Sequence, residues 1–265
     1  MAKRRPPAPA ELPPDVRLTN VTAAVFAVIG ALLIIVVAAL WLVRQPVFTL
    51  RAISIDGDVT RNSLATIRAN AMPQLTGNYF TLDLGAARRA FESVPWVRSA
   101  VVRRIWPNRL AVRLEEHRPA ALWSLDTGDR IVNTFGEVFE ANVGDVEDDA
   151  LPTLRGPDGT SAHMLVLLTR LAPEFVPLDA GIATLGMTSR GSWRAELDNE
   201  AEIELGRGTD DEIVERTRRF VATVTQVTSR YQRPVVSADL RHHEGYAVKL
   251  KGVSTTTIDK NTTRN

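Results

Sequence analysis

The strongest hydropathy signal in the chain is an uninterrupted apolar segment near its start. Residues Val21 to Val43 carry no charged side chain across 23 positions. A helix rises about 1.5 Å per residue, so this segment is long enough to cross a hydrocarbon core about 30 Å thick. A secretory signal peptide is the alternative, but its apolar region is usually about 7 to 15 residues and ends in a small-x-small cleavage site. Because Leu40 to Val43 directly follow Ala39, the pattern favours a membrane anchor over 21–43.

Basic residues flank this apolar segment unequally and predict its orientation. Four precede it and two closely follow it: Lys3, Arg4, Arg5 and Arg17, against Arg44 and Arg51. Because cytoplasmic flanks carry the excess of Lys and Arg, we expect the start of the chain in the cytoplasm and everything after the anchor outside it. The first 20 residues are also rich in proline, which predicts a disordered cytoplasmic tail over 1–20.

After the anchor, the spacing of apolar residues predicts a small α+β domain. Period-two alternation marks strands, and spacings of three and four mark helices. The expected elements are a strand around 53–56, helices over 64–71 and 83–94, and strands over 97–105 and 110–114. This order of strand, helix, helix, strand and strand is typical of helices packed on one face of a sheet, and His117 to Pro119 marks its end.

Shorter apolar runs separated by turns predict a second region rich in β-structure. The expected elements are strands around 131–132, 138–140, 181–187, 193–197, 201–205, 235–240 and 245–250, with a helix over 164–171. Thr209 and Glu212 form a capping box that opens a longer helix ending before Pro234. The fold class is therefore α+β, with a mainly antiparallel second domain carrying helices on one face. Residues 254–265 are polar, which predicts a disordered end.

The residues that usually carry chemistry form no recognisable constellation. The chain has no cysteine, and its four histidines lack metal-ligand spacing: His117, His163, His242 and His243. Five arginines on the predicted hairpin, Arg98, Arg103, Arg104, Arg109 and Arg113, superficially resemble a nucleic-acid surface, but placement outside the cytoplasm excludes that partner. We therefore expect no enzyme activity, cofactor, metal, nucleic acid or small-molecule substrate, and a membrane-tethered binding module instead.

The order of short motifs resembles one known family over nearly the whole chain. The stretches that carry it are Phe48 to Gly57, Asn78 to Asp83, Pro95 to Ala100, Arg103 to Leu110, Glu115 to Trp123, Gly136 to Phe139, Leu151 to Pro157, Ser189 to Trp193 and Asp239 to Arg241. Taken in order, they are similar to the FtsQ/DivIB family of bacterial cell-division proteins.

The resemblance implies a domain plan and a cellular role. Residues 44–119 would be a POTRA domain of order β-α-α-β-β, and 120–253 the family's β domain. Members are non-enzymatic, single-pass type II scaffolds of the inner membrane, with their C-terminal domains in the periplasm at the division septum. They bind FtsB and FtsL, link early to late division proteins including FtsW and FtsI, and help control septal peptidoglycan synthesis. The alternative is a POTRA-containing envelope assembly or secretion component, a class that usually continues into a β-barrel.

The resemblance also implies where the partners bind. In the family the last strand offers an unpaired edge that a partner segment completes, and arginines meet partner acids. The matching positions here are Arg190, Arg241, His242, Glu244, Gly245, Tyr246, Ala247, Val248, Lys249 and Leu250. His242 and Leu250 depart from the tyrosine and tryptophan of enteric members. For Tyr246, Val248 and Leu250, which share one face of the strand, ordinary core packing is the alternative role.

Overall fold

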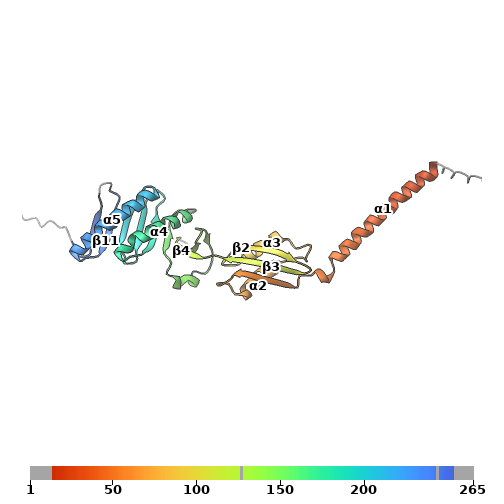
Figure 1. Ribbon diagram of the computed structural model, residues 1–265, viewed down its shortest axis with the longest axis horizontal. Coiled ribbons are helices and arrows are strands. Elements are labelled where there is room, and N and C mark those ends of the chain that lie inside the picture. The colour runs from red at the N-terminus through yellow and green to blue at the C-terminus, as the bar shows by residue number, and fades with distance from the viewer. Residues whose placement is uncertain (1–13, 126–127, 243–244, 254–265) are drawn as a thin grey trace, which may run out of the picture. The chain divides into compact units, whose positions relative to one another are not determined.

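The computed structural model describes residues 14–125, 128–242 and 245–253 (Figure 1). Its first element is the helix α1 (Pro14–Val43), and the stretch Thr19–Val43 is long and apolar enough to cross a membrane. The helix begins before the expected boundary at Val21, so the prediction of disorder is wrong for residues 14–20. Proline is tolerated in a first helical turn, where its missing N–H would have no helical acceptor. Residues 1–13 lie outside the described part of the chain.

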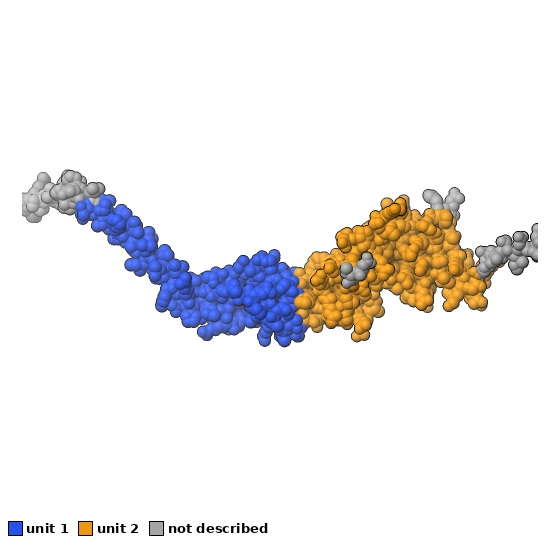
Figure 2. All heavy atoms as spheres, turned by 180° about the vertical axis from the view of Figure 1, so that it is seen from behind, with its two compact units in different colours: residues 1–59, 63–94, 99–115 blue, residues 60–62, 95–98, 116–265 orange. Residues whose placement is uncertain are grey.

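The chain divides into two compact units, shown in different colours in Figure 2. The first comprises residues 1–59, 63–94 and 99–115, and the second comprises residues 60–62, 95–98 and 116–265. The short segments 60–62 and 95–98 belong to the second unit because their partners lie there. The buried Glu116 carboxylate accepts backbone N–H groups from residues 60 to 62 at 2.7 to 2.9 Å, and Trp96 packs with Ile131 and Val146.

A three-stranded sheet and two helices form the fold that follows the anchor. The elements are η1 (Pro46–Phe48), β1 (Ala52–Asp58), α2 (Leu64–Ala71), η2 (Met72–Gln74), α3 (Leu84–Glu92), β2 (Val97–Ile105) and β3 (Arg109–Glu116). The sheet order is β1-β3-β2, with β1 parallel to β3. Ser63 and Asp83 accept backbone N–H groups at the starts of α2 and α3, as expected of N-caps. The predicted β-α-α-β-β order is confirmed.

The second unit is built on a nine-stranded sheet within the described residues. Its strands are β4 (Pro119–Trp123), β5 (Arg130–Asn133), β6 (Val138–Phe139), β7 (Thr153–Arg155), β8 (Ile182–Met187), β9 (Trp193–Leu197), β10 (Glu202–Gly206), β11 (Val235–Asp239) and β12 (Ala247–Leu250). The order is β12-β11-β10-β9-β8-β7-β4-β5-β6. Parallel pairing joins β4 to β7, β7 to β8 and β10 to β11, while the other neighbours are antiparallel.

Two helices cover one face of this sheet (Figure 1). They are α4 (Ser161–Phe175) and α5 (Asp210–Tyr231), and the connections also contain η3 (Val143–Asp149) and η4 (Val176–Leu178). The core between helices and sheet includes Leu167 and Leu171 of α4, Ile213 and Phe220 of α5, and Leu185 of β8, all at most 1% exposed. The predicted α+β class, with helices on one face, is confirmed.

The structure adds two strands that the hydrophobic pattern did not predict, β4 and β7. Both lie inside the sheet and pair with each other in parallel, and Trp123 and Leu154 are almost fully buried. A three-residue strand is too short to display alternation, and β4 opens with Pro119, Ala120 and Ala121, residues with low strand propensity. The last strand starts at Ala247 instead of the predicted Gly245.

Candidate functional site

The last strand, β12, forms one edge of the second sheet. It pairs antiparallel with β11 through Ala238 opposite Val248 and Asp239 opposite Ala247. Across residues 14–125, 128–242 and 245–253, no strand lies on its other side. An edge strand carries a row of N–H and C=O groups that another chain can pair with.

Backbone hydrogen bonds show which groups of β12 face outward. The N–H of Lys251 donates to the carbonyl oxygen of Pro234, the residue before β11, at 3.0 Å. The backbone groups of residue 251 therefore point toward the β11 side. Successive residues of a strand point their backbone groups in opposite directions. Ala247 and Lys249 therefore bond to β11, whereas the backbone groups of Val248 and Leu250 point away from the sheet. The Leu250 carbonyl accepts the Val253 N–H at 3.3 Å. We call the outward N–H and C=O groups of Val248 and the outward N–H of Leu250 the open edge of β12.

Side chains of β12 alternate as the sequence pattern predicts. Leu250 is buried, and Tyr246 and Val248 are half-buried against the main core, with the Tyr246 ring 5.0 Å from that of Phe220 in an edge-to-face arrangement. Ala247 and Lys249 are exposed. The inner face of the strand thus fixes β12 onto the helix layer, and the outer face exposes small and basic side chains.

Arg241 lies just beyond the end of β11, beside the open edge. Its Nε and Nη2 donate to the two carboxylate oxygens of Asp239 at 2.9 and 2.6 Å, and its backbone N–H also donates to Asp239 at 3.0 Å. The Arg241 side chain holds the pKa of Asp239 at about 2, well below its usual range. The guanidinium keeps further N–H groups that a second carboxylate can use.

Arg190 lies in the turn between β8 and β9, where Gly191 adopts a φ of +73°. The start of β9 is paired with the end of β10, and β11 runs parallel to β10. Arg190 and Arg241 therefore occupy the same end of the sheet. Arg190 is exposed, and no carboxylate in the described part of the chain forms an ion pair with it.

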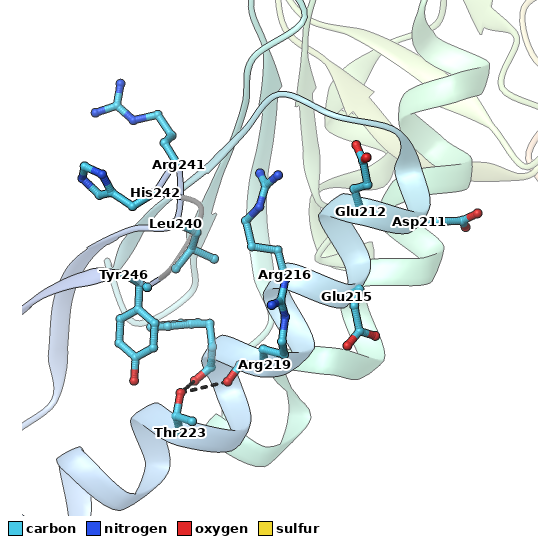
Figure 3. A pocket seen from close by; sticks show the side chains of 12 residues that line it. Asp211, Glu212, Glu215, Arg216, Arg219, Thr223, Leu240, Arg241, His242 and Tyr246 are labelled. Atoms are coloured by element: carbon cyan, nitrogen blue, oxygen red, sulfur yellow. Dashed lines mark hydrogen bonds between the residues drawn. The ribbon is translucent and has the colours of Figure 1, made fainter.

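A groove lies between α5 and the connection from β11 to β12 (Figure 3). It has a volume of about 650 Å³, with Leu240 and Tyr246 on the sheet side and Arg216 and Arg219 among the residues of α5. Sequence reasoning did not predict this groove. The signal that the sequence offers is the helical spacing of Glu212 and Arg216, which places these two charged residues on one face of α5.

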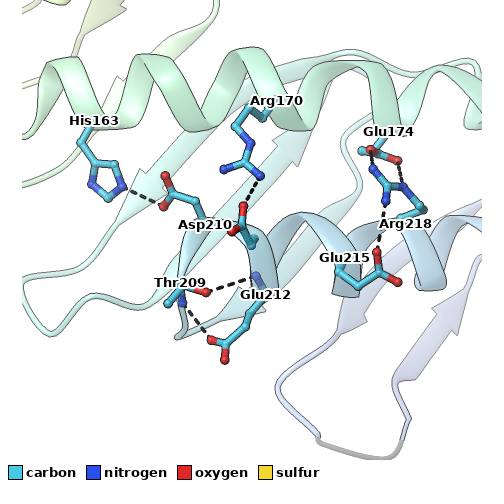
Figure 4. A network of polar contacts seen from close by, with 9 residues as sticks. His163, Arg170, Glu174, Thr209, Asp210, Glu212, Glu215 and Arg218 are labelled. Carbon is cyan, nitrogen blue, oxygen red and sulfur yellow. Dashed lines mark hydrogen bonds and ion pairs between the residues drawn. The ribbon is translucent and has the colours of Figure 1, made fainter.

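Polar contacts fix the helix that forms one wall of this groove (Figure 4). Thr209 and Glu212 form the predicted capping box at the start of α5, with the Thr209 N–H donating to Glu212 at 2.9 Å. His163 of α4 contacts Asp210 at 2.8 Å, and Arg218 of α5 donates to Glu174 of α4 at 2.7 Å. His163 therefore has a structural role in joining the two helices.

The structure brings most of the predicted partner-binding residues together at one corner of the sheet. Arg241, His242, Gly245 and the residues of β12 are contiguous, and His242 and Gly245 are exposed. Arg190 shares that end of the sheet but lies two to three strands away from β11, at the β8–β9 turn. Glu244 lies outside the described residues.

Two family models match the chain. The one described as "Cell division protein FtsQ/DivIB, C-terminal" matches residues 121–241, and "POTRA domain, FtsQ-type" matches residues 48–117. The cell division protein FtsQ of Thiomonas arsenitoxydans is 40% identical over 255 residues, which cover 96% of this chain and 94% of that protein. The chain belongs to the FtsQ/DivIB family. Its first sheet with α2 and α3 is thus a POTRA domain.

Other relatives agree with this membership. FtsQ of Burkholderia pseudomallei is 40% identical over 243 residues, covering 90% of this chain and 94% of that protein. FtsQ of Bordetella pertussis is 39% identical over 254 residues, covering 89% and 92%. Together with the apolar helix α1, membership of the FtsQ/DivIB family makes this chain a single-pass membrane protein of cell division. It also favours division over the alternative of envelope assembly or secretion.

Proposed function

We propose that the chain is a non-enzymatic scaffold that binds the FtsB and FtsL pair by strand addition at the open edge of β12. The observation that carries the proposal is the pairing of β12 with β11 alone among the described strands. A partner segment that adopts a strand satisfies the outward N–H and C=O groups of Val248 and the outward N–H of Leu250, and gains main-chain hydrogen bonds in doing so.

The residues at this corner add specificity to main-chain pairing. A guanidinium binds a carboxylate through two parallel hydrogen bonds, so Arg190 and Arg241 fix the register of an acidic partner segment. Asp239 already orients Arg241. Gly245, which has no side chain, and the small exposed side chain of Ala247 leave room for a partner backbone, and the exposed His242 and Lys249 complete the surface.

The domain plan and location of the scaffold follow from the same hypothesis. Residues 44–119 form the POTRA domain and 120–253 the β domain, both in the periplasm, while the tail 1–20 is cytoplasmic. The protein lies in the inner membrane at the division septum, where it links FtsB and FtsL to FtsW, FtsI and other division proteins and controls septal peptidoglycan synthesis. The excess of basic residues before α1 supports this orientation.

A proline substitution at the open edge tests strand addition directly. Val248→Pro removes an outward N–H without breaking a hydrogen bond to β11, because proline is tolerated on an edge strand whose N–H faces solvent. We expect binding of the reconstituted FtsB and FtsL pair by the full-length variant to weaken about tenfold or more, since a lost hydrogen bond and a clashing ring together exceed about 1.4 kcal/mol.

The opposite edge of the same sheet offers a matched control. The N–H of Asn133 donates to the carbonyl of Glu137 at 3.0 Å, so the backbone groups of the next residue, Val138, point away from β5. Val138→Pro in β6 therefore makes the same chemical change on an outward N–H. We expect this variant to bind normally. Normal partner affinity in a folded Val248→Pro chain, verified by circular dichroism, would exclude docking at β12.

A further inference from the structure

Four aromatic side chains form a connected cluster on the POTRA domain. Phe48 of η1 contacts the rings of Phe80 and Trp106 at centroid distances of 4.9 and 5.6 Å, and Tyr79 contacts the same two rings at 5.2 and 5.6 Å. The cluster is not buried. Trp106 is 63% exposed and Phe80 46%, and the neighbouring Val47 and Ile105 are 56% and 43% exposed. We call these six residues the aromatic end of the POTRA domain.

The chain topology places this cluster at the end of the domain that is joined to the anchor. Phe48 follows the last residue of α1, Val43, by five positions, so the two lie at most about 18 Å apart. The Asn78 side chain donates to the Val43 carbonyl at 2.7 Å, and the Tyr79 N–H donates to the Phe48 carbonyl at 2.9 Å. The turn that contains Trp106 precedes β3, which starts beside the start of β1.

Arginines occur at both ends of the POTRA sheet, since Arg113 stands opposite Asp56, but the acidic residues of its strands lie at one end only. Arginines lie near the aromatic end, where Arg51 immediately precedes β1 and Arg109 pairs with Ala52. Acidic residues lie at the opposite end of the parallel strands, where Asp56 and Glu115 stand close to the ends of β1 and β3. Asp83, three residues after Phe80 in the chain, accepts backbone N–H groups at the start of α3 at 2.7 and 3.2 Å.

We propose that the aromatic end is a membrane-docking surface that inserts into the lipid–water interface beside α1. Indole and phenol rings favour this zone because one part of the ring is apolar and another forms hydrogen bonds. Arginines at its rim attract anionic headgroups within a Debye length of the surface. The lipid is the occupant because α1 delivers this surface to the interface through a connection of two residues, Arg44 and Gln45, before η1.

Docking has a consequence for the rest of the molecule. An anchor followed by an unattached domain permits that domain to tilt freely, whereas a second contact with the same bilayer restricts its tilt. The POTRA domain would then stand in a defined orientation above the membrane. The inference does not depend on partner binding at β12, because its residues all belong to the first unit.

Single cysteine labels test the docking surface, because the chain has no cysteine of its own. The full-length variant Ile105→Cys is reconstituted in nanodiscs of anionic lipid and labelled with a nitroxide. Leu64→Cys is the matched control, an exposed aliphatic residue that starts α2 near the far end of β1. We expect the nitroxide at 105 to have a several-fold higher ratio of oxygen to nickel-chelate collision rates than the nitroxide at 64. Equal ratios at both positions would overturn the proposal.

A second variant separates docking from local shielding. Replacing the two most exposed rings, by Phe80→Ser with Trp106→Ser, removes the inserting groups and leaves the domain core in place. The nitroxide at 105 should then have the same ratio of oxygen to nickel-chelate collision rates as the nitroxide at 64. A ratio that stays high at 105 would contradict docking through these rings. Zwitterionic nanodiscs should lower the ratio at 105, and an unchanged ratio would contradict the contribution of the arginines.

Discussion

Asp239 orients the Arg241 side chain, because its carboxylate accepts hydrogen bonds from both Nε and Nη2 of Arg241. Asp239 ends β11 and Arg241 follows it by two positions, the spacing at which side chains of a strand share one side. This pair was therefore accessible to sequence reasoning. The same alternation correctly placed Tyr246, Val248 and Leu250 on one face of β12. That Tyr246 meets Phe220 was not predictable, because it depends on how α5 crosses the sheet.

The ion pair at Asp239 predicts a measurable titration. Its pKa is lowered to about 2 from an ordinary value of 3.8, chiefly through the hydrogen bonds from Arg241. Arg241→Ala should return this pKa toward the ordinary value, as followed by NMR of the Asp239 carboxyl carbon. Asp210, which contacts His163 instead of an arginine, is an internal comparison. An Asp239 titration unchanged by Arg241→Ala would contradict the assignment.

The sign of the pH dependence follows from that shift. A lowered pKa means that the folded state stabilises the ionised carboxylate, so this contribution is present above about pH 4 and is lost as the pH falls toward about 2. The free energy of unfolding of the unmodified chain should therefore fall more steeply over that interval than the free energy of unfolding of Arg241→Ala. Parallel pH profiles from chemical denaturation of the two proteins would argue against the ion pair.

Elements with strong periodicity and clear caps follow directly from the sequence. The strand over 97–105 and the α5 capping box are examples, because each is determined by neighbours in the chain. The strands β4 and β7 are different. Their parallel partners come from distant parts of the chain, and pairing of that kind leaves no local signature in three to five residues. The open edge of β12 was reached from a family resemblance, and the groove beside it was not predicted at all.

The capping box gives a prediction at the scale of one helix. Thr209→Ala removes the oxygen that accepts the Glu212 N–H, and should lower the free energy of unfolding by about 1 kcal/mol. Thr223→Ala is the comparison, because Thr223 is an exposed residue inside the same helix and alanine has the higher helix propensity. That variant should be neutral or slightly more stable in a denaturant titration. Equal losses for both would show that the cap contributes nothing specific.

In the proposed function, the anchor and the β12 edge act together at the scale of the whole molecule. A helix in the bilayer confines the chain to two dimensions, which raises its effective concentration for partners that are themselves membrane-bound. The position of the anchor was evident from hydropathy, because an apolar segment of twenty or more residues is characteristic of a transmembrane helix. The start of the helix at Pro14 was not evident from the sequence, because proline disrupts a helix everywhere except in its first turn.

Orientation in the membrane is testable with single cysteines. Lys251→Cys, at an exposed position after β12, should react with a membrane-impermeant maleimide in cells whose outer membrane has been permeabilised. Ala10→Cys, before the anchor, should react only after the inner membrane is disrupted. The reverse pattern of labelling would contradict the proposed periplasmic location of the two domains.

The most direct measurement of docking at β12 is amide hydrogen exchange of the full-length chain with and without the FtsB and FtsL pair. In the unbound chain the amides of Ala247 and Lys249 should exchange slowly, because they bond to β11, while the outward amides of Val248 and Leu250 should exchange quickly. Binding should slow Val248 and Leu250 by roughly tenfold or more, since a hydrogen-bonded amide exchanges only on local opening. Unchanged exchange at these two residues in the saturated complex would contradict strand addition.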